Sequence, residues 1–274
     1  MTKKFLFIMT TALFAVLLLY ALITSAELGG GKTMKPKSGS IKIEWYGHAC
    51  FALTLDNGYS IIIDPFDGMP YTVPKLENVW LALATHSHFD HNNVSGVNPE
   101  STIIGEGETM KFGSKIVKDK LELNKEGKDI SIWGIVSLHD KQQGKQRGSN
   151  TIFVLKIDDM LIAHLGDLGH VLKEEQLEKM KEIGAIDILF IPVGGHFTID
   201  EKEATKVVEQ LSPKLVFPMH YKTDILPKNF PIVGVEKFLK GKSNVERIDS
   251  STIMVSKDEL PDKTRIVVLK YYEE

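Results

Sequence analysis

The chain has a single cysteine, Cys50, among 274 residues, and it therefore forms no internal disulfide bond. One thiol says nothing about the redox compartment, and we interpret it as buried and structural. The chain also lacks a strong charge of either sign, because 33 Lys and Arg face 36 Asp and Glu, a net charge of −3. This balance argues against a nucleic-acid polyanion as partner. The single cysteine disfavours a disulfide scaffold. No internal repeat is apparent, which disfavours a repeat array.

The start of the chain is strongly apolar. Lys3 and Lys4 precede an uncharged stretch of 22 residues from Phe5 to Ala26, which ends in the small residues typical of a leader cleavage site. Such a stretch is also long enough to cross a bilayer, and a buried soluble helix is the third alternative. We predict that residues 1–26 are a signal peptide or a membrane anchor. The protein is then exported to the periplasm or the cell exterior, or tethered to the membrane.

Residues 27–40 are rich in Gly, Pro, Ser and Lys, a composition typical of a flexible linker. The remaining 41–274 are enough for one large two-layer core and too few for two enzyme domains. We therefore expect one catalytic domain over 41–274.

The most informative motif follows an apolar run in the first third of this domain. His86, His88, Asp90 and His91 lie within six residues. In an extended segment, side chains at i and i+2 point the same way, so His86 and His88 can converge on one cation. Asp90 and His91 come where the chain turns and can face a second. Imidazole and carboxylate suit zinc, and also manganese or iron. A chance surface cluster is the alternative.

Three further candidate ligands each follow an apolar segment. His139 follows the run that ends at Leu138, Asp167 follows a run that stops at Gly166, and His220 ends the run beginning at Lys214. Polar residues at the carboxyl ends of strands are the usual ligands and catalytic groups at a sheet edge. Taken together with the histidine motif, they predict a dinuclear metal site.

Hydrophobic patterning predicts many strands and few helices. Helices are expected at Lys173–Ile183 and Asp200–Leu211, the second capped by Thr198 or Asp200. Two sheets packed together with helices outside fit this pattern. Strands are expected near Ile41–Trp45, Cys50–Leu55, Tyr59–Ile63, Trp80–Ala84, Thr102–Ile104, Ile130–Leu138, Thr151–Ile157, Leu161–His164, Ile186–Ile191, Lys214–Pro218, Val245–Ile248, Thr252–Val255 and Arg265–Lys270.

These motifs, in this order, resemble the metallo-β-lactamase fold superfamily. The likeness covers about residues 41–270 and implies an α/β (α+β) domain, the four-layer αββα sandwich. It is closest to the small single-domain branch that includes ascorbate-6-phosphate lactonase and N-acylphosphatidylethanolamine phospholipase D. The segments that carry this closer likeness are Gly47-His48-Ala49-Cys50-Phe51, Asp64-Pro65, Gly166-Asp167-Leu168-Gly169-His170, Pro192-Val193-Gly194-Gly195 and Met219-His220-Tyr221.

The resemblance implies a ligand set for two divalent metal ions, with zinc first and manganese or iron as alternatives. One ion would be held by His86, His88 and His139, and the other by Asp90, His91 and His220, with Asp167 bridging both. A hydroxide between the ions would then attack an ester, lactone or phosphodiester of a small-molecule or lipid substrate. Asp90 is also expected to be catalytic. An oligomer is compatible with all of this.

Several other polar residues near the motifs have two alternative interpretations, one functional and one structural. His196 follows paired glycines and is a candidate proton donor to a leaving group, and His170 is a candidate substrate contact; each is alternatively a solvated loop histidine. Arg147, in a basic loop after His139, is expected to grip a phosphate or carboxylate, or else to belong to a hydrophilic hairpin. His48 either lines the site or is structural, and His164 is expected to pack away from the metals.

The sequence thus favours a metal-dependent hydrolase. A mononuclear-iron oxidoreductase such as a sulfur dioxygenase shares the same motif and is the second hypothesis. The third is a metal-binding protein without turnover.

Overall fold

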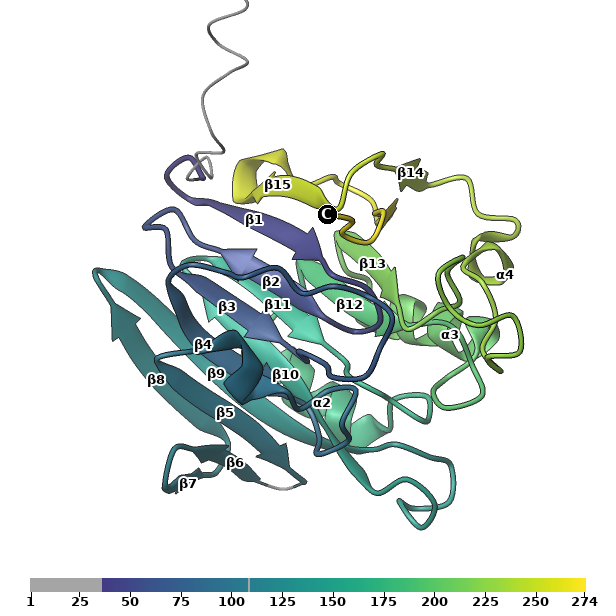
Figure 1. The fold of residues 1–274 in the computed structure, drawn as a ribbon, viewed down its shortest axis with the longest axis horizontal. Coiled ribbons are helices and arrows are strands. Elements are labelled where there is room, and N and C mark those ends of the chain that lie inside the picture. The colour runs from purple at the N-terminus through teal and green to yellow at the C-terminus, as the bar shows by residue number, and fades with distance from the viewer. Residues whose placement is uncertain (1–35, 108) are drawn as a thin grey trace, which may run out of the picture. The chain divides into compact units, whose positions relative to one another are not determined.

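Two mixed β-sheets form the domain in the computed structural model, which describes residues 36–107 and 109–274. In these residues each sheet has eight strands (Figure 1). The order is β15-β1-β2-β3-β4-β5-β6-β7 in the first and β14-β16-β13-β12-β11-β10-β9-β8 in the second. The predicted segment of residues 1–26, and most of the predicted linker, lie outside the described residues.

The first sheet takes most of its strands from the amino-terminal half. They are β1 (Ser40–Trp45), β2 (Phe51–Thr54), β3 (Ser60–Ile63), β4 (Val79–Ala84), β5 (Ser101–Glu106), β6 (Thr109–Phe112), β7 (Lys115–Val117) and β15 (Thr252–Ser256). β1, β2 and β3 pair antiparallel, whereas β3, β4 and β5 pair parallel.

The second sheet is continuous in sequence over its central strands. Its members are β8 (Lys120–Lys125), β9 (Lys128–Leu138), β10 (Ser149–Ile157), β11 (Met160–His164), β12 (Ile188–Pro192), β13 (Leu215–Met219), β14 (Val245–Arg247) and β16 (Arg265–Val268). β8 to β11 form an antiparallel meander, and β11, β12, β13 and β16 run parallel.

The helices follow from amphipathic sequence. α2 (Glu174–Ile183) buries Leu177 and Met180 and packs on β9, while α3 (Glu201–Leu211) buries Ala204 and Val207. Asp200 caps α3, its carboxylate accepting the N–H groups of Lys202 and Glu203. The other helical segments are η1 (Val94–Val97), α4 (Glu236–Leu239) and η2 (Lys257–Glu259). Among the described residues, every helix is too short or too polar to span a bilayer.

The predicted two-sheet sandwich with helices outside is confirmed, with one departure. No α-helix in the described residues covers the outer face of the first sheet. A second apolar cluster lies there instead, in which loop residues such as Phe66, Tyr71, Leu226 and Ile232 pack against strand residues such as Ala82. Loops and η1 therefore form most of that outer layer.

Three strands were not expected from sequence. In β8, side chains alternate between exposed and half-buried, and its residues are mostly Lys, Glu and Asn. Leu121 and Leu123 nevertheless pack on the core cluster. β6 and β7 are three or four residues long, too short for a periodic signal. These segments form strands through hydrogen bonding to neighbouring strands, because the hydrophobic pattern of their own residues is weak.

The site is positioned where strands of both sheets end. His86 follows β4 of the first sheet; His139, Asp167 and His220 follow β9, β11 and β13 of the second. The main chains at these ends are joined, since the Thr151 N–H donates to the Thr85 carbonyl at 2.9 Å and the His220 N–H donates to the His48 carbonyl at 3.0 Å. One edge of the sandwich therefore collects polar residues that are far apart in sequence.

We expect deletion of residues 1–26 to leave a folded, soluble domain that keeps its metal content. The physical reason is that β1 begins at Ser40, and every predicted ligand lies beyond residue 85. Circular dichroism, sedimentation and elemental analysis of the truncated chain check this, with the full chain partitioned between membrane and soluble fractions as the control. A truncated chain that aggregates or fails to fold would assign the first segment to the core and would contradict a leader or anchor.

Candidate metal centre

Histidines and one aspartate gather in three overlapping groups at this edge. Within each group the potential ligand atoms all lie within 4.8 Å of one another. The groups are His86, His88 and His139; His86, His91 and Asp167; and His48, His91 and His220. Together they contain six of the seven predicted ligands, Asp90 being the exception, and they add His48.

The first group has the arrangement expected for three imidazoles around one ion. His86 Nε2 lies 3.1 Å from His88 Nδ1. Burial, together with the charge of His91, lowers the pKa of His86 to about 3, so the ring is neutral and its nitrogen lone pair is available. Neutral imidazole is the form that binds a metal.

The Asp167 carboxylate is where the groups meet. Its Oδ2 lies 3.0 Å from His139 Nε2 and 3.3 Å from both His91 Nε2 and His220 Nε2. Burial alone would raise the pKa of Asp167, but the imidazoles of His220 and His91 outweigh it and hold the pKa well below its usual range. Asp167 is therefore an anion in a buried site, surrounded by nitrogen ligands.

A network of hydrogen bonds behind the ligands fixes which nitrogen each ring presents. The His91 Nδ1–H donates to Asp64 Oδ2 at 2.9 Å, which leaves Nε2 facing Asp167. The Thr85 hydroxyl donates to the same Asp64 oxygen at 2.8 Å and accepts from His86 Nδ1 at 3.0 Å. The backbone N–H of Thr85 donates to Asp64 Oδ1 at 2.7 Å. Partners of this kind orient metal-binding histidines and fix their tautomers.

The backbone of Asp167 is held by a buried side chain. Asn150 Oδ1 accepts the Asp167 N–H at 2.9 Å, and Asn150 Nδ2 donates to Ser137 Oγ and to the Leu165 carbonyl. Gly166, just before, has a φ of 53°, and a Cβ there would lie 2.4 Å from Asn150 Oδ1. Glycine is thus required at this turn by both conformation and space.

The residues present fit bound metal ions. Several buried polar atoms have no hydrogen-bond partner among the described residues, including Asp167 Oδ1, His91 Nε2, His139 Nδ1 and His220 Nδ1. Burial lowers the pKa of His91, but the Asp167 and Asp64 carboxylates outweigh it and raise the pKa well above its ordinary value. The field at His91 Nε2 therefore favours positive charge, which a metal ion supplies in place of a proton.

Asp90 lies beside this centre and contacts His48. Its Oδ2 is 3.3 Å from His48 Nε2. Burial opposes ionisation of Asp90, but His48 and the charge of His91 hold its pKa below the usual range. A predicted ligand and an unassigned histidine are thus neighbours.

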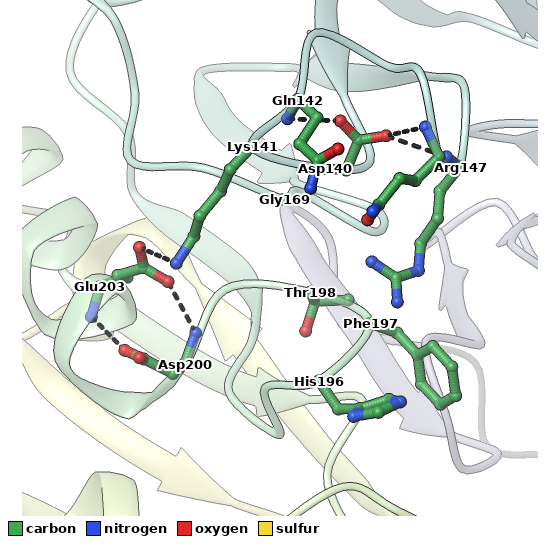
Figure 2. Close-up of a pocket in the computed structure, with 11 residues that line it drawn as sticks. Asp140, Lys141, Gln142, Arg147, Gly169, His196, Phe197, Thr198, Asp200 and Glu203 are labelled. Atoms are coloured by element: carbon green, nitrogen blue, oxygen red, sulfur yellow. Dashed lines mark hydrogen bonds and ion pairs between the residues drawn. The ribbon is translucent and has the colours of Figure 1, made fainter.

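Two of the other predicted site residues share one pocket. Arg147 and His196 line a cavity of about 240 Å³ together with Phe197, Lys141 and Glu203. Figure 2 shows the Arg147 side chain extending toward Phe197 and His196. The guanidinium carbon lies 5.4 Å from the centre of the Phe197 ring, a cation–π distance. That ring is in turn 6.4 Å from the His220 ring, so the pocket adjoins the metal ligands.

The loop that presents Arg147 is organised by one carboxylate. Asp140 Oδ1 accepts the N–H groups of Gln142 and Gly144, and Oδ2 accepts those of Gln146 and Arg147, at 2.7–2.9 Å. Burial opposes ionisation of Asp140, but these four donors outweigh it and lower its pKa. The loop is therefore an ordered turn around an anion, directly after ligand His139.

The structure does not bring His170 to this pocket. Its Nδ1 donates to the Val171 carbonyl at 2.8 Å and its Nε2 accepts the Leu138 N–H at 3.4 Å. The ring lines a separate depression against α2. Both ring nitrogens have backbone partners, so the substrate contact expected of His170 stays a prediction. His164 packs in the core, where its Nε2 donates to the Ala49 carbonyl at 2.9 Å, and it belongs to no ligand group.

Four residues of the site had been assigned no role from sequence: Asp64, Thr85, Asp140 and Asn150. The Asp64-Pro65 pair after an apolar strand was a signal for the first, since a carboxylate at a strand end is typical of a functional edge. Asn150 carried no such signal, because its partner Asp167 lies seventeen residues away, in the turn after β11. Phe197 was likewise not expected to support Arg147.

Comparison with known proteins identifies relatives of this chain. A family model described as "Beta-lactamase superfamily domain" matches residues 42–220. A UPF0173 metal-dependent hydrolase of Pyrococcus horikoshii is 33% identical, over 67% of this chain and 85% of its own length. Another from Koribacter versatilis is 30% identical, over 73% and 92%.

A solved structure from Thermotoga maritima is also similar to this chain. It is described as a proposed Zn-dependent hydrolase of the metallo-β-lactamase superfamily. It matches with a TM-score of 0.61 and 33% identity, and the match covers 84% of this chain and 98% of that one.

We predict that Asp64→Asn weakens metal binding roughly ten- to a hundredfold, the usual effect of losing the partner of a ligating histidine. An amide nitrogen in place of Oδ2 cannot accept the His91 Nδ1–H, so the ring loses the tautomer that presents Nε2. Competition with a chromogenic chelator measures the affinity. Asp158→Asn, in an exposed hairpin turn with a φ of 53°, is the matched control and should bind metal like the natural protein. Equal affinity in the Asp64 variant would contradict this role.

Proposed function

The chain belongs to the beta-lactamase superfamily, and on this premise we propose that it is a hydrolase that uses two divalent metal ions to cleave an ester, lactone or phosphodiester bond. The observation that carries the proposal is the convergence of three imidazoles on one buried carboxylate oxygen, with the His86, His88 and His139 group beside it. Relatives at about one third identity that are named metal-dependent hydrolases support the reaction class.

In this proposal the ligands divide between two positions. His86, His88 and His139 would hold one ion, and Asp90, His91 and His220 the other, with Asp167 shared. Zinc is the first candidate, because neutral imidazole and carboxylate are its usual ligands. When bound, such ions polarise the scissile carbonyl or phosphoryl group and lower the pKa of water, so that no protein nucleophile is required.

The pocket beside the ligands supports an anionic substrate. Arg147 has no carboxylate partner among the described residues, whereas Lys141 in the same loop pairs with Glu203 at 2.6 Å. An unpaired guanidinium that is stacked on Phe197 and lines a cavity suits a phosphate or carboxylate on the substrate. His196, exposed in the same cavity, would give a proton to the leaving group. The substrate would thus carry its negative charge next to the scissile bond.

We expect Asp167→Ala to lose most of the activity and at least one metal ion. The variant removes the only carboxylate that contacts three of the ligand imidazoles in the described residues, so it leaves those rings without their shared anionic partner. Elemental analysis and turnover of an ester, lactone or phosphodiester panel provide the test. Asp187→Ala, a buried aspartate that pairs with Lys257, is a control for the general cost of losing a buried carboxylate. Two tightly bound ions and full turnover in Asp167→Ala would sink the proposal.

Arg147→Ala should raise KM and leave the metal content unchanged. Loss of one charge-assisted pair is worth about 1.5–3 kcal/mol, or about ten- to a hundredfold in kcat/KM. Arg147→Lys should recover only part of this, because an ammonium group cannot reproduce the two-pronged guanidinium contact. Lys141→Ala is the matched control in the same loop, and a much smaller change is expected there. An unchanged kcat/KM for Arg147→Ala on the true substrate would assign this loop to the hydrophilic-hairpin alternative.

A further inference from the structure

His48 is a buried histidine at the metal centre with no assigned part in it. Its ring centre lies 4.0 Å from that of His220 and 5.0 Å from that of His91. Its carbonyl accepts the His220 N–H at 3.0 Å, so the two residues are tied through their backbones. His48 and His220 both have a φ of 50°, a left-handed conformation that non-glycine residues seldom adopt. Such backbone strain is concentrated at functional sites.

Among the described residues, the Asp90 carboxylate is the one group that a ring nitrogen of His48 approaches as an ion pair. Neither ring nitrogen has a conventional hydrogen bond among the described residues, yet Nε2 lies 3.3 Å from Asp90 Oδ2. This distance is slightly beyond the usual N–H···O range of about 2.7–3.2 Å. A carboxylate only accepts, so the nitrogen that faces it carries the proton.

Asp90 in turn depends on this contact. Its side chain is 22% exposed, and in residues 36–107 and 109–274 it has no other ion pair or side-chain hydrogen bond. An aspartate at that exposure is otherwise free to turn its carboxylate into water. Holding it against the ligand groups requires a fixed donor on the protein side, and His48 is placed to be that donor.

We propose that His48 is a positioning residue that holds Asp90 in place to bind the second metal ion through its Nε2–H. The inference rests on the proposed two-metal function, and it deepens that function by explaining how the predicted ligand outside the three groups is brought to the site. A hydrogen bond to a ligating carboxylate is the same kind of support that Asp64 gives to His91.

Two substitutions of similar polarity separate this role from a packing role. In His48→Asn the side-chain amide reaches only as far as Nδ1 of the histidine, so it cannot contact Asp90, although asparagine tolerates the left-handed backbone. In His48→Gln the amide nitrogen reaches the position of Nε2 and can donate. We expect the affinity for the second ion to fall about ten- to a hundredfold in the Asn variant and to be largely restored in the Gln variant.

The readout is zinc bound per chain after equilibration against a series of chelator concentrations, with the melting temperature of the metal-free protein as the check on folding. His48→Asn is also measured in an Asp90→Ala background, where positioning predicts no further loss because the residue to be held is gone. An additional tenfold loss there would make His48 an independent ligand and overturn the proposal. Equal zinc affinity in His48→Asn and the natural protein would overturn it as well. A natural protein that binds a single ion would instead refute the two-metal function.

Discussion

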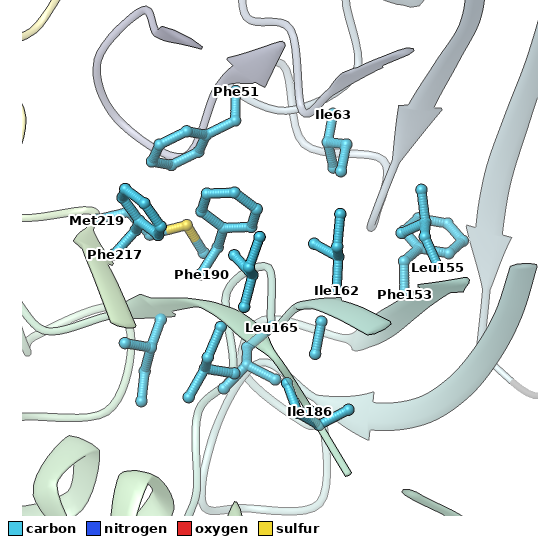
Figure 3. Close-up of a cluster of buried hydrophobic side chains, with 14 of the residues drawn as sticks. Phe51, Ile63, Phe153, Leu155, Ile162, Leu165, Ile186, Phe190, Phe217 and Met219 are labelled. Atoms are coloured by element: carbon cyan, nitrogen blue, oxygen red, sulfur yellow. The ribbon is translucent and has the colours of Figure 1, made fainter. Parts of the chain in front are cut away.

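The buried Asp167 carboxylate is the contact on which the arrangement of the site depends. Its Oδ2 contacts imidazole nitrogens that come from both sheets. His91 follows β4 of the first sheet, whereas His139 and His220 follow β9 and β13 of the second. Aromatic side chains in the core pack the two sheets against each other. Phe51 of β2 lies 4.2 Å from Phe190 of β12, ring centre to ring centre, and Phe217 of β13 packs beside it (Figure 3). A shift between the sheets would separate the ligands.

This arrangement is costly without a cation. Buried polar atoms without hydrogen bonds cost about 1–3 kcal/mol each, and so do non-glycine residues in the left-handed region. The site contains both, since Asp167 Oδ1 and His220 Nδ1 are unpartnered among the described residues and Asp64 and His220 have positive φ. Metal ions offset part of this cost by binding lone pairs that nothing else satisfies. Asp64, Thr85 and Asn150 keep the ligands oriented, so the centre is preorganised.

Sequence patterning predicted the sandwich and most of its strands, because buried strands with runs such as Ile188–Pro192 are apolar over their whole length. It also predicted residues that the structure brings together, since six of the seven predicted ligands fall in the three groups and Asp90 lies beside them. The supporting residues could not be found in this way. Asn150 reaches Asp167 only because β10 and β11 pair as a hairpin, and Asp64 reaches His91 only because β3 and β4 pair side by side. β8 was missed because its only apolar residues, Leu121 and Leu123, are too few to give a periodic signal.

Local geometry adds detail to alternatives that the sequence left open. His164 and His48 are both buried histidines at strand ends or turns, yet one donates to the Ala49 carbonyl and the other faces Asp90. For the loop after His139, the hydrophilic hairpin and the anion-binding loop both remain predictions. Four backbone donors around Asp140 show that it is ordered, and the Arg147 guanidinium stacked on Phe197 directs it toward the cavity beside His220.

We propose a two-metal hydrolytic centre for this protein rather than the single iron of a dioxygenase. The most direct test is to count and identify the metal ions in the purified natural protein by elemental analysis, and to locate them by anomalous diffraction. We predict two zinc or manganese ions per chain, one on each side of Asp167. A single iron, held by His86, His88 and His139 alone, would contradict the account.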